Sequence, residues 1–300
     1  MTDSSNLVGS NSPPSPRVLV GITTRNRASI LPKALASARA QNYPNLTIAV
    51  LDDGSTDGTS ALSAQYPDIT WQTHAQSRGI IESRNELMRG CDAEYYVSID
   101  DDAWFLQRDE ISRAIARLER APHVAAIAFD ILSPDRPTPV SRNEPEMVSI
   151  FIGCGHVLRL AAVRAAGFYA SAPGIYGSEE KDLCYRLADL GYSVEKLTGV
   201  HVWHEKAWND RDWYGLHRSG VCNEFAMTLR RCPAPDVLAV MPLKLLSFCW
   251  FWVRQPRFLA PGLAGVAQFL AHFAGTCASR QPVKREIFWS MVRRRAASNR

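Results

Sequence analysis

Three consecutive aspartates, Asp100, Asp101 and Asp102, follow an apolar run and are followed at once by Trp104 and Phe105. Adjacent carboxylates repel one another, so a fold tolerates them where the charges face water or share a cation. Hard divalent cations such as Mg²⁺ and Mn²⁺ prefer carboxylate oxygens and often share their site with substrate phosphates. The triplet therefore indicates a divalent metal site, although an acidic surface turn would have the same composition.

Two further polar clusters also follow apolar runs. One contains Thr23 and Arg25, and the other begins with Asp52 and Asp53. In open parallel α/β sheets, ligands bind beyond the carboxyl ends of the strands. Hydroxyl and guanidinium groups beside carboxylates suit a ligand that has hydrogen-bonding rings and phosphates held through a divalent metal. We therefore expect these two clusters and the acidic triplet to form one site.

The order of apolar and amphipathic segments predicts an α/β fold with a mainly parallel sheet. Apolar, β-branched runs predict strands at 17–24, 46–53, 69–74, 93–102 and 123–132. Helical spacing predicts helices at 29–41, 59–66, 79–91, 109–120 and 178–192. The segment 149–169 has the pattern of a strand, a glycine-rich bend and a helix. Gly191 suits the C-terminal end of the helix predicted at 178–192.

Charge is distributed unevenly along the 300 residues. Through Glu205 there are 19 Lys and Arg against 25 Asp and Glu, whereas from Lys206 onward there are 15 against 5. Such a basic C-terminal part suggests an anionic partner, either nucleic acid or anionic lipid. The positive charge accompanies apolar segments and no recognisable DNA- or RNA-binding motif, so we expect no nucleic-acid partner.

The two ends of the chain differ from its middle. Residues 1–16 are polar and rich in Pro and Ser, without the apolar core of a signal peptide, and predict a disordered leader. Seven cysteines at scattered spacings favour reduced thiols in a cytoplasmic protein. Residues 17–215 form the predicted α/β domain, and 216–300 form a basic, apolar helical region.

Within the C-terminal region, residues 237–253 are apolar and aromatic but are interrupted by Pro242 and Lys244. This run is shorter than the roughly 20 residues that span a membrane. We expect it and the apolar run at 258–275 to lie in a membrane interface. The alternative is a helical hairpin packed on the domain.

Four ordered blocks of this chain resemble the family 2 inverting glycosyltransferases, which have the nucleotide-sugar-binding GT-A fold. The blocks are "VLVGITTRNRASILPKALASARAQNYPNLTIAVLDDGSTDGTS", "SRGIIESRNELMRGCDAEYYVSIDDD", "FIGCGHVLRLAAVRAAGFY" and "YGSEEKDLCYRLADLGY". Each motif alone is a weak signal, but four in this order and spacing are specific. The resemblance covers residues 17–205, and it implies a mixed, mainly parallel sheet flanked by helices.

The resemblance implies a role in donor binding for several residues. Thr23 and Arg25 match positions that line the nucleotide base and diphosphate. Asp53 matches a carboxylate that accepts a hydrogen bond from a pyrimidine N3–H, which favours uracil or thymine, and Asp52 lies beside it. Arg84 matches a basic residue near the phosphates, with a surface ion pair as the alternative.

The metal ligands follow from the same resemblance. Asp100 and Asp102 match the ends of the family's DxD motif, with Asp102 on the metal directly. Asp100 or Asp101 contacts the ribose or a metal-bound water. A histidine after the last strand of such domains completes the metal shell, and His204 fits that position better than His201.

The predicted catalytic base departs from the family pattern. The family has Glu-Asp-x-Asp-Leu where this chain has Glu179-Glu180-Lys181-Asp182-Leu183. Glu180 therefore stands at the position of the aspartate that acts as the catalytic base in the family. A glutamate can also act as a general base, and Glu179 is a candidate to share the role. An acidic first helical turn is the purely structural alternative. Gly153, Gly155 and Asp182 are expected to border the sugar or acceptor.

The sequence thus predicts an inverting glycosyltransferase that uses a nucleoside-diphosphate sugar, favouring UDP or dTDP, and Mg²⁺ or Mn²⁺. Its partners would be the donor, a carbohydrate or lipid-linked acceptor, and the cytoplasmic face of a membrane, in cell-surface polysaccharide or glycolipid assembly. One alternative is a nucleotide-sugar-binding module without catalysis. A nucleotidyltransferase is the other, although residues 21–31 lack the Gly-rich, Lys-containing loop that it needs.

Overall fold

The computed structural model describes residues 15–139, 145–206 and 212–298. The predicted leader lies almost entirely outside these residues. The described strands are β1 (Val18–Thr24), β2 (Leu46–Asp52), β3 (Thr70–Thr73), β4 (Tyr95–Ile99), β5 (Ala103–Phe105), β6 (Val124–Leu132), β7 (Glu146–Val148), β8 (Gly155–Arg159) and β9 (Ser193–His204). They form one sheet in the order β3-β2-β1-β4-β8-β6-β9-β5, and β7 pairs with β9.

The sheet is mixed. Strands β3, β2, β1 and β4 are parallel to one another, and β6 is parallel to β9. Strand β8 lies antiparallel between β4 and β6, and β5 and β7 are antiparallel to β9. In the segment 149–169 the strand follows the glycines, whereas the sequence pattern predicted it before them. Residues 149–154 instead form the loop that leads into β8.

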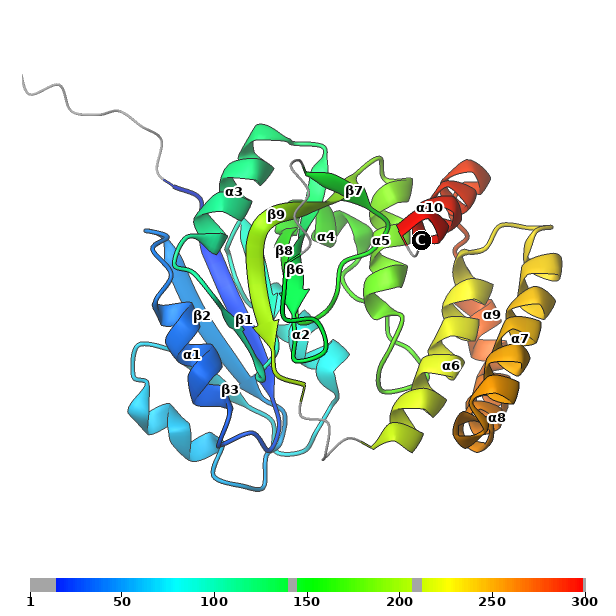
Figure 1. Ribbon diagram of the computed structural model, residues 1–300, viewed down its shortest axis with the longest axis horizontal. Helices are drawn as coiled ribbons and strands as arrows, with labels where there is room; N and C mark the ends of the chain where they lie inside the picture. Colours follow the sequence, from blue (N-terminus) through cyan, green and yellow to red (C-terminus); the bar gives the residue numbers. More distant parts are fainter. Residues whose placement is uncertain (1–14, 140–144, 207–211, 299–300) are drawn as a thin grey trace, which may run out of the picture.

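Helices cover both faces of the sheet (Figure 1). On one face lie α1 (Leu31–Arg39) and α3 (Glu110–Arg120), and on the other lie α2 (Ile80–Arg89), α4 (Leu160–Ala166) and α5 (Glu179–Asp189). Successive strand residues point to opposite faces, and in β1 both sets are apolar and buried. The predicted helix at 59–66 is a 3₁₀ helix, η1 (Ser60–Gln65).

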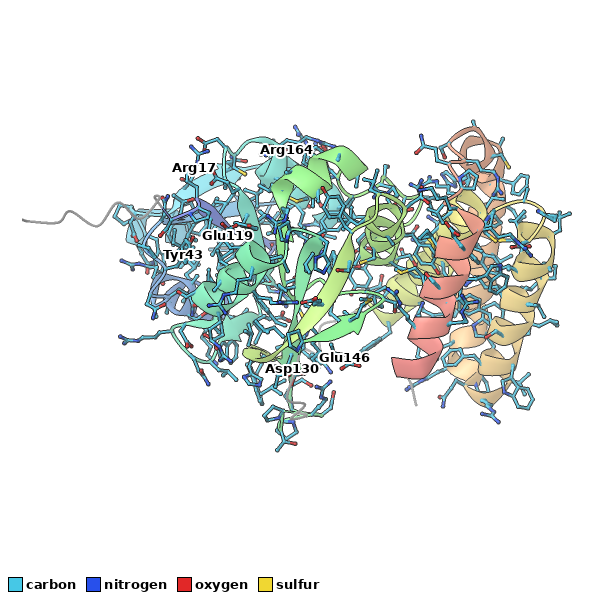
Figure 2. All side chains as sticks on the ribbon, turned by 90° about the horizontal axis from the view of Figure 1, so that it is seen from above. Arg17, Tyr43, Glu119, Asp130, Glu146 and Arg164 are labelled. Atoms are coloured by element: carbon cyan, nitrogen blue, oxygen red, sulfur yellow. The ribbon has the colours of Figure 1, made fainter. Side chains whose placement is uncertain are left out.

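The C-terminal helices lie to one side of the sheet (Figures 1 and 2). They are α6 (Trp213–Arg231), α7 (Val237–Arg254), the short 3₁₀ helix η2 (Pro256–Phe258), α8 (Leu259–Ala271), α9 (Phe273–Ala278) and α10 (Arg285–Ser298). Phe225 of α6 packs against Phe248 of α7 and Phe269 of α8, and Phe288 of α10 packs on Tyr185 of α5. The predicted boundary after residue 215 falls inside the first turn of α6.

Helix α7 differs from the sequence prediction. It runs without a break through Pro242, which removes one hydrogen bond near the start of the helix. Within the described residues it is the one helix long and apolar enough to cross a membrane by length and composition. Only Trp252 of its 18 residues is buried, but Phe248 and Trp252 pack α7 against α6 and α8, so one face of the helix packs on the domain while the other is exposed.

Candidate active site

A cavity of about 690 Å³ opens at the carboxyl ends of β1, β2 and β4. Seven of the predicted donor-site and metal-site residues line it, together with three segments to which the sequence assigned no role. The predicted residues on its wall are Thr23, Arg25, Asp53, Asp100, Asp101, Asp102 and His204, and the added segments are 77–82, 171–176 and the start of α6. The carboxyl ends of neighbouring parallel strands meet at one edge of a sheet, which explains the convergence.

Asp52 and Asp53 have different roles although they are adjacent. Asp52 is fully buried, and its carboxylate accepts hydrogen bonds from the Ser55 backbone N–H, at 2.9 Å, and from the Ser60 hydroxyl. It therefore holds the turn after β2 and does not line the cavity. Gly54 in this turn has a φ of +74°, and a side chain there would lie 2.8 Å from the Ser77 backbone nitrogen.

Asp53 organises the loop that follows β3. Its carboxylate accepts hydrogen bonds from the Ser77 hydroxyl at 2.6 Å, from the backbone N–H groups of Arg78 and Gly79 at 2.8 and 2.9 Å, and from His74 Nδ1 at 2.7 Å. Burial alone would raise the pKa of Asp53, but these bonds lower it to about 2. The loop and the cavity wall thus depend on an ionised Asp53.

His74 is a site residue that sequence reasoning missed. It is buried, and its Nε2 lies 2.9 Å from Glu86 Oε2 while its Nδ1 contacts Asp53. Burial would lower the pKa of His74, but Asp53 and Glu86 raise it, which favours the imidazolium. The available signal was its position: it ends the predicted strand at 69–74, at the same edge of the sheet as Asp53.

The three aspartates of the acidic triplet lie in different environments. Asp100 Oδ1 accepts a hydrogen bond from Arg84 Nη2 at 2.7 Å, and Asp101 Oδ1 lies 3.6 Å from Arg27 Nε. Burial, followed by the neighbouring Asp102, raises the pKa of Asp101 to about 7. Asp102 is buried, and its Oδ1 lies 3.1 Å from His204 Nε2.

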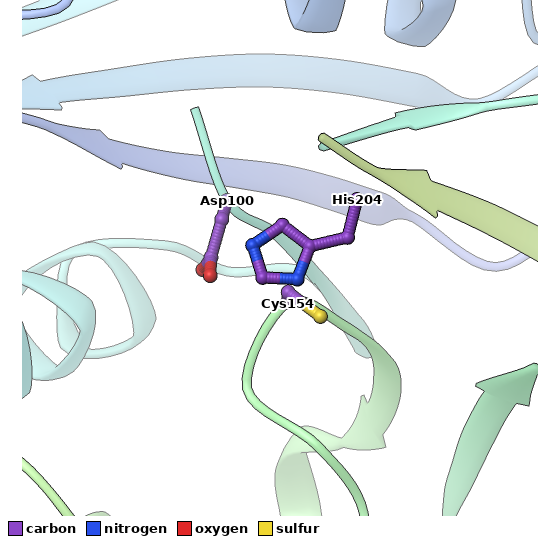
Figure 3. A group of neighbouring side chains, drawn as sticks. All are labelled: Asp100, Cys154 and His204. Atoms are coloured by element: carbon purple, nitrogen blue, oxygen red, sulfur yellow. The ribbon is translucent and has the colours of Figure 1, made fainter. Parts of the chain in front are cut away.

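His204 is placed to bind a cation. Its Nε2 is buried and makes no hydrogen bond of acceptable geometry to any described residue, including Asp102. Ligand atoms of Asp100, Cys154 and His204 all lie within 4.8 Å of one another (Figure 3). Carboxylates with one imidazole fit Mg²⁺ or Mn²⁺, whereas a thiol suits softer ions. Of the two histidines at the end of β9, His204 lines the cavity and His201 does not.

Glu179 and Glu180 begin α5 behind the cavity wall and are not among the residues that line it. Glu179 is buried, and neither of its carboxylate oxygens has a hydrogen-bond partner among the described residues. The Glu180 side chain is 17% exposed, and its Oε1 lies 3.4 Å from Arg84 Nη1. Burial and then the neighbouring Glu179 raise the pKa of Glu180 to about 8, against the opposing effect of Arg84.

Arg84 connects the two acidic groups. Its guanidinium is buried, and it reaches Asp100, Glu180 and the Gly153 carbonyl oxygen, which lies 3.3 Å from Nη2. Burial would lower the pKa of Arg84, but Asp100 and Glu180 raise it, so the group stays charged. The alternative of a surface ion pair is wrong, because the side chain is only 3% exposed and faces Asp100.

The three residues predicted to border the acceptor lie in different surroundings. A side chain at Gly153 would lie 2.4 Å from Glu180 Oε1, so only a glycine at this position avoids a steric clash with the Glu180 carboxylate. At Gly155 the neighbours are the core side chains Ile131 and Phe129, which makes that position one of packing. Asp182 is buried between Arg186 and Arg231, at 2.7 and 2.6 Å, and it holds α5 to α6 instead of facing the cavity.

The chain is similar in sequence to glycosyltransferases. The family model described as glycosyl transferase family 2 matches residues 19–161. A pre-mycofactocin glycosyltransferase of Mycobacterium tuberculosis is 27% identical over 65% of this chain, which spans 44% of that relative's length.

Solved structures share the fold. A mannosyltransferase from Pyrobaculum calidifontis, solved with GDP-Man and Mn²⁺, has a TM-score of 0.57 at 21% identity, covering 86% of this chain and 76% of its own. TarS 1–349 of S. aureus in complex with UDP-GlcNAc has a TM-score of 0.58 at 15% identity, covering 77% and 73%. At these identities the likeness establishes the architecture alone.

Proposed function

Because residues 19–161 belong to glycosyl transferase family 2, we propose that this chain moves a sugar from a nucleoside-diphosphate sugar to an acceptor hydroxyl with inversion. The donor would be a UDP- or dTDP-sugar, and the product a cell-surface polysaccharide or glycolipid. One observation carries the proposal. The cavity brings the polar ends of β1 and β2 to the acidic triplet and to His204, whose Nε2 lies 3.1 Å from Asp102 Oδ1.

The residues present fit a divalent metal. Asp102, Asp100 and His204 would hold Mg²⁺ or Mn²⁺, and a metal bound there offsets the negative charge that develops on the leaving diphosphate. The mannosyltransferase neighbour was solved with Mn²⁺, which supports a divalent ion of this kind. The Cys154 thiol lies beside these ligands, and burial followed by the charge of Asp100 raises its pKa, so it stays protonated.

The remaining residues of the cavity would position the donor. Thr23 and Arg25 border the end of β1 and would contact the base and diphosphate. Asp53 would accept a hydrogen bond from the pyrimidine N3–H. Four hydrogen bonds already fill the Asp53 carboxylate, so the Ser77 hydroxyl would rotate away to free one acceptor position. Asp101 or Asp100 would contact the ribose.

Glu180 would take the proton of the acceptor hydroxyl. The acceptor oxygen then forms its bond to the anomeric carbon while the bond from that carbon to the diphosphate oxygen breaks on the opposite side. Arg84 holds Asp100 and Glu180 at fixed distances, so it would position the base relative to the donor. Tyr176 lines the cavity, and the acceptor would pass beside it.

A screen of donors tests the proposal. We expect UDP- and dTDP-sugars to raise the unfolding temperature of the protein in the presence of Mn²⁺, and GDP-sugars to raise it less. At a ligand concentration of 100 times Kd the stabilisation is about 2.7 kcal/mol, which a thermal melt detects easily. Omitting the metal should remove most of the shift. A GDP-sugar preference would contradict the role of Asp53, and no shift with any donor would contradict the proposed function.

Helix α7 supports contact with a membrane. Leu243, Leu246 and Trp250 are each 60–63% exposed, and Leu238 and Val253 are 77% and 73% exposed. Arg254 and Arg257 follow directly, and basic groups beside an apolar helix face attract anionic lipid. We propose that the chain lies peripherally on the cytoplasmic face of a membrane through this helix.

Charging the exposed face of α7 should release the protein from lipid. We expect Leu246→Glu combined with Trp250→Glu, which lie four residues apart on one face, to lower the bound fraction on anionic vesicles at least about tenfold. Cosedimentation with phosphatidylserine-containing vesicles measures it. Met147→Glu on β7, also half-exposed, is the matched control and should have no effect. If the double variant binds these vesicles as well as the wild type does, the membrane proposal is wrong.

A further inference from the structure

A second cavity, of about 800 Å³, is lined by residues of α5, α6, α7 and α10 and lies next to the candidate active site. Its wall is largely aromatic and aliphatic, with Tyr176, Trp213, Phe248 and Phe258 among its residues. Four ionised side chains also line it: Lys181, Glu224, Lys244 and Arg295. None of these four has a part in the donor site described above.

Two lysines of this cavity share one carboxylate. Glu224 Oε1 accepts hydrogen bonds from Lys181 and from Lys244, the latter at 2.5 Å, and its Oε2 accepts one from Ser178 at 2.9 Å. Burial alone would raise the pKa of Glu224, but the two lysines lower it, so this carboxylate is ionised at neutral pH. The pair of lysines thus carries one more positive charge than Glu224 offsets.

Lys181 is a buried lysine with a lowered pKa. Burial, with smaller contributions from Lys244 and Arg295, lowers its pKa to about 8 against the opposing effect of Glu224. A second anion between these groups would stabilise the charged lysine, since opposite charges favour the ionised form. The cavity is thus suited to a ligand that brings negative charge.

The second cavity is continuous with the donor cavity. Tyr176 and Leu216 line both of them. Lys181 directly follows Glu180 in α5, so the proposed base and the cationic group are neighbours on one helical turn. A ligand whose anionic end lies at Lys181 would therefore extend past Tyr176 towards Glu180.

On its other side the cavity adjoins the exposed apolar face of α7. Lys244, Ser247 and Phe248 of α7 form its wall, and Leu243 and Leu246 beside them are exposed. An apolar chain attached to the anionic group would contact this exposed apolar face of α7. Neither an inorganic anion nor a neutral sugar would use both features.

We propose that this cavity binds the phosphate or diphosphate of a lipid-linked acceptor. The charged group lies at Lys181, Lys244 and Arg295, the lipid chain lies along α7, and the sugar hydroxyl points past Tyr176 to Glu180. This inference rests on the proposed transfer function, and it specifies the acceptor as an anionic lipid carrier.

Farnesyl phosphate is the probe, and quenching of tryptophan fluorescence, with Trp213 in the wall, is the readout. Farnesyl phosphate should bind saturably, whereas farnesol and inorganic phosphate should each bind at least about tenfold more weakly, because hydrogen bonds to charged groups contribute about 1.5–3 kcal/mol. Equal binding of farnesol would assign the signal to the apolar surface alone and overturn the proposal. Equal binding of inorganic phosphate would reduce the site to one for free anions and overturn it too.

Two variants locate the site. Lys244→Gln and Arg295→Gln should each weaken farnesyl phosphate binding about tenfold, and the unfolding temperature of each variant without ligand reports whether it is folded. Lys33→Gln removes one positive charge from the exposed side of α1, at the far side of the sheet, and should change nothing. Unchanged binding by both cavity variants would refute the assignment.

Donor binding separates this inference from the proposed function. If the wild-type protein gains no stability from any nucleotide sugar with Mn²⁺, the transfer function itself fails. If the donor stabilises the protein but farnesyl phosphate does not bind, only the acceptor assignment fails.

Discussion

Replacing Glu180 by Gln is expected to lower kcat for sugar transfer by roughly 10²–10⁴-fold, the range that a positioned general base contributes. The amide has the shape of the carboxylate but cannot accept the acceptor proton. Donor binding should persist, since Glu180 does not line the donor cavity. Turnover is measured as nucleoside diphosphate released with acceptor present, and binding as the donor-induced rise in unfolding temperature.

Two companion variants sharpen this result. Glu180→Asp restores the residue type that the family has at this position, and it should retain more activity than Glu180→Gln. Glu179→Gln tests whether the neighbouring carboxylate shares the role. If Glu180→Gln turns over within tenfold of the wild type, the base lies elsewhere, and loss of donor binding as well would point to misfolding.

The pH profile is a second readout of the same residue. Because the pKa of Glu180 is raised to about 8, the carboxylate is mostly protonated at pH 7 and becomes the active base as the pH rises. In the wild type, kcat/KM should therefore increase with pH through about 8. The Glu180→Gln variant should lack this increase of kcat/KM with pH, since its side chain does not titrate.

Replacing Asp102 by Ala should abolish metal-dependent catalysis, with a loss of about 10³-fold or more in kcat. Asp102 is buried beside His204, and without its carboxylate the cation would lose the ligand closest to that imidazole. The rise in unfolding temperature that donor and Mn²⁺ cause together should also disappear. That thermal readout does not depend on knowing the acceptor.

Asp68→Ala is the matched control for this variant, because Asp68 is an exposed aspartate that pairs only with Arg39 among the described residues. It should bind donor and metal as the wild type does. The unfolding temperature of Asp102→Ala without ligands reports whether the variant is folded. Undiminished transfer by a folded Asp102→Ala protein would mean that the metal site is misplaced.

Much of the donor cavity could be predicted from the sequence because strand ends are local features. The apolar runs that end at Thr24, Asp52 and Ile99 are each followed by polar residues, and parallel strands bring such ends together. Alternation of side chains along a strand allowed at most one of His201 and His204 to face the cavity, and the family resemblance favoured His204. His74 also stands at the end of a strand and was missed.

Charge pairing could not be predicted in this way. Arg84, Glu180 and Asp182 all lie on amphipathic helices, where a surface ion pair and a buried one give the same pattern. Which carboxylate each guanidinium meets depends on how α2, α5 and α6 pack, and these partners are 16–96 residues apart. The acceptor role predicted for Asp182 failed for this reason, because Arg186 and Arg231 occupy its carboxylate.

By itself the sequence determined the alternation of strands and helices, the parallel part of the sheet and the convergence of the acids on one edge. These depend on side-chain periodicity and on where apolar runs end, which are properties of short segments. The tertiary structure alone decided that β8 runs antiparallel between β4 and β6, that Arg84 joins Asp100 to Glu180, and that a cationic cavity adjoins the active site. Strand pairing and the burial of charge depend on the packing of distant segments, which no local pattern specifies.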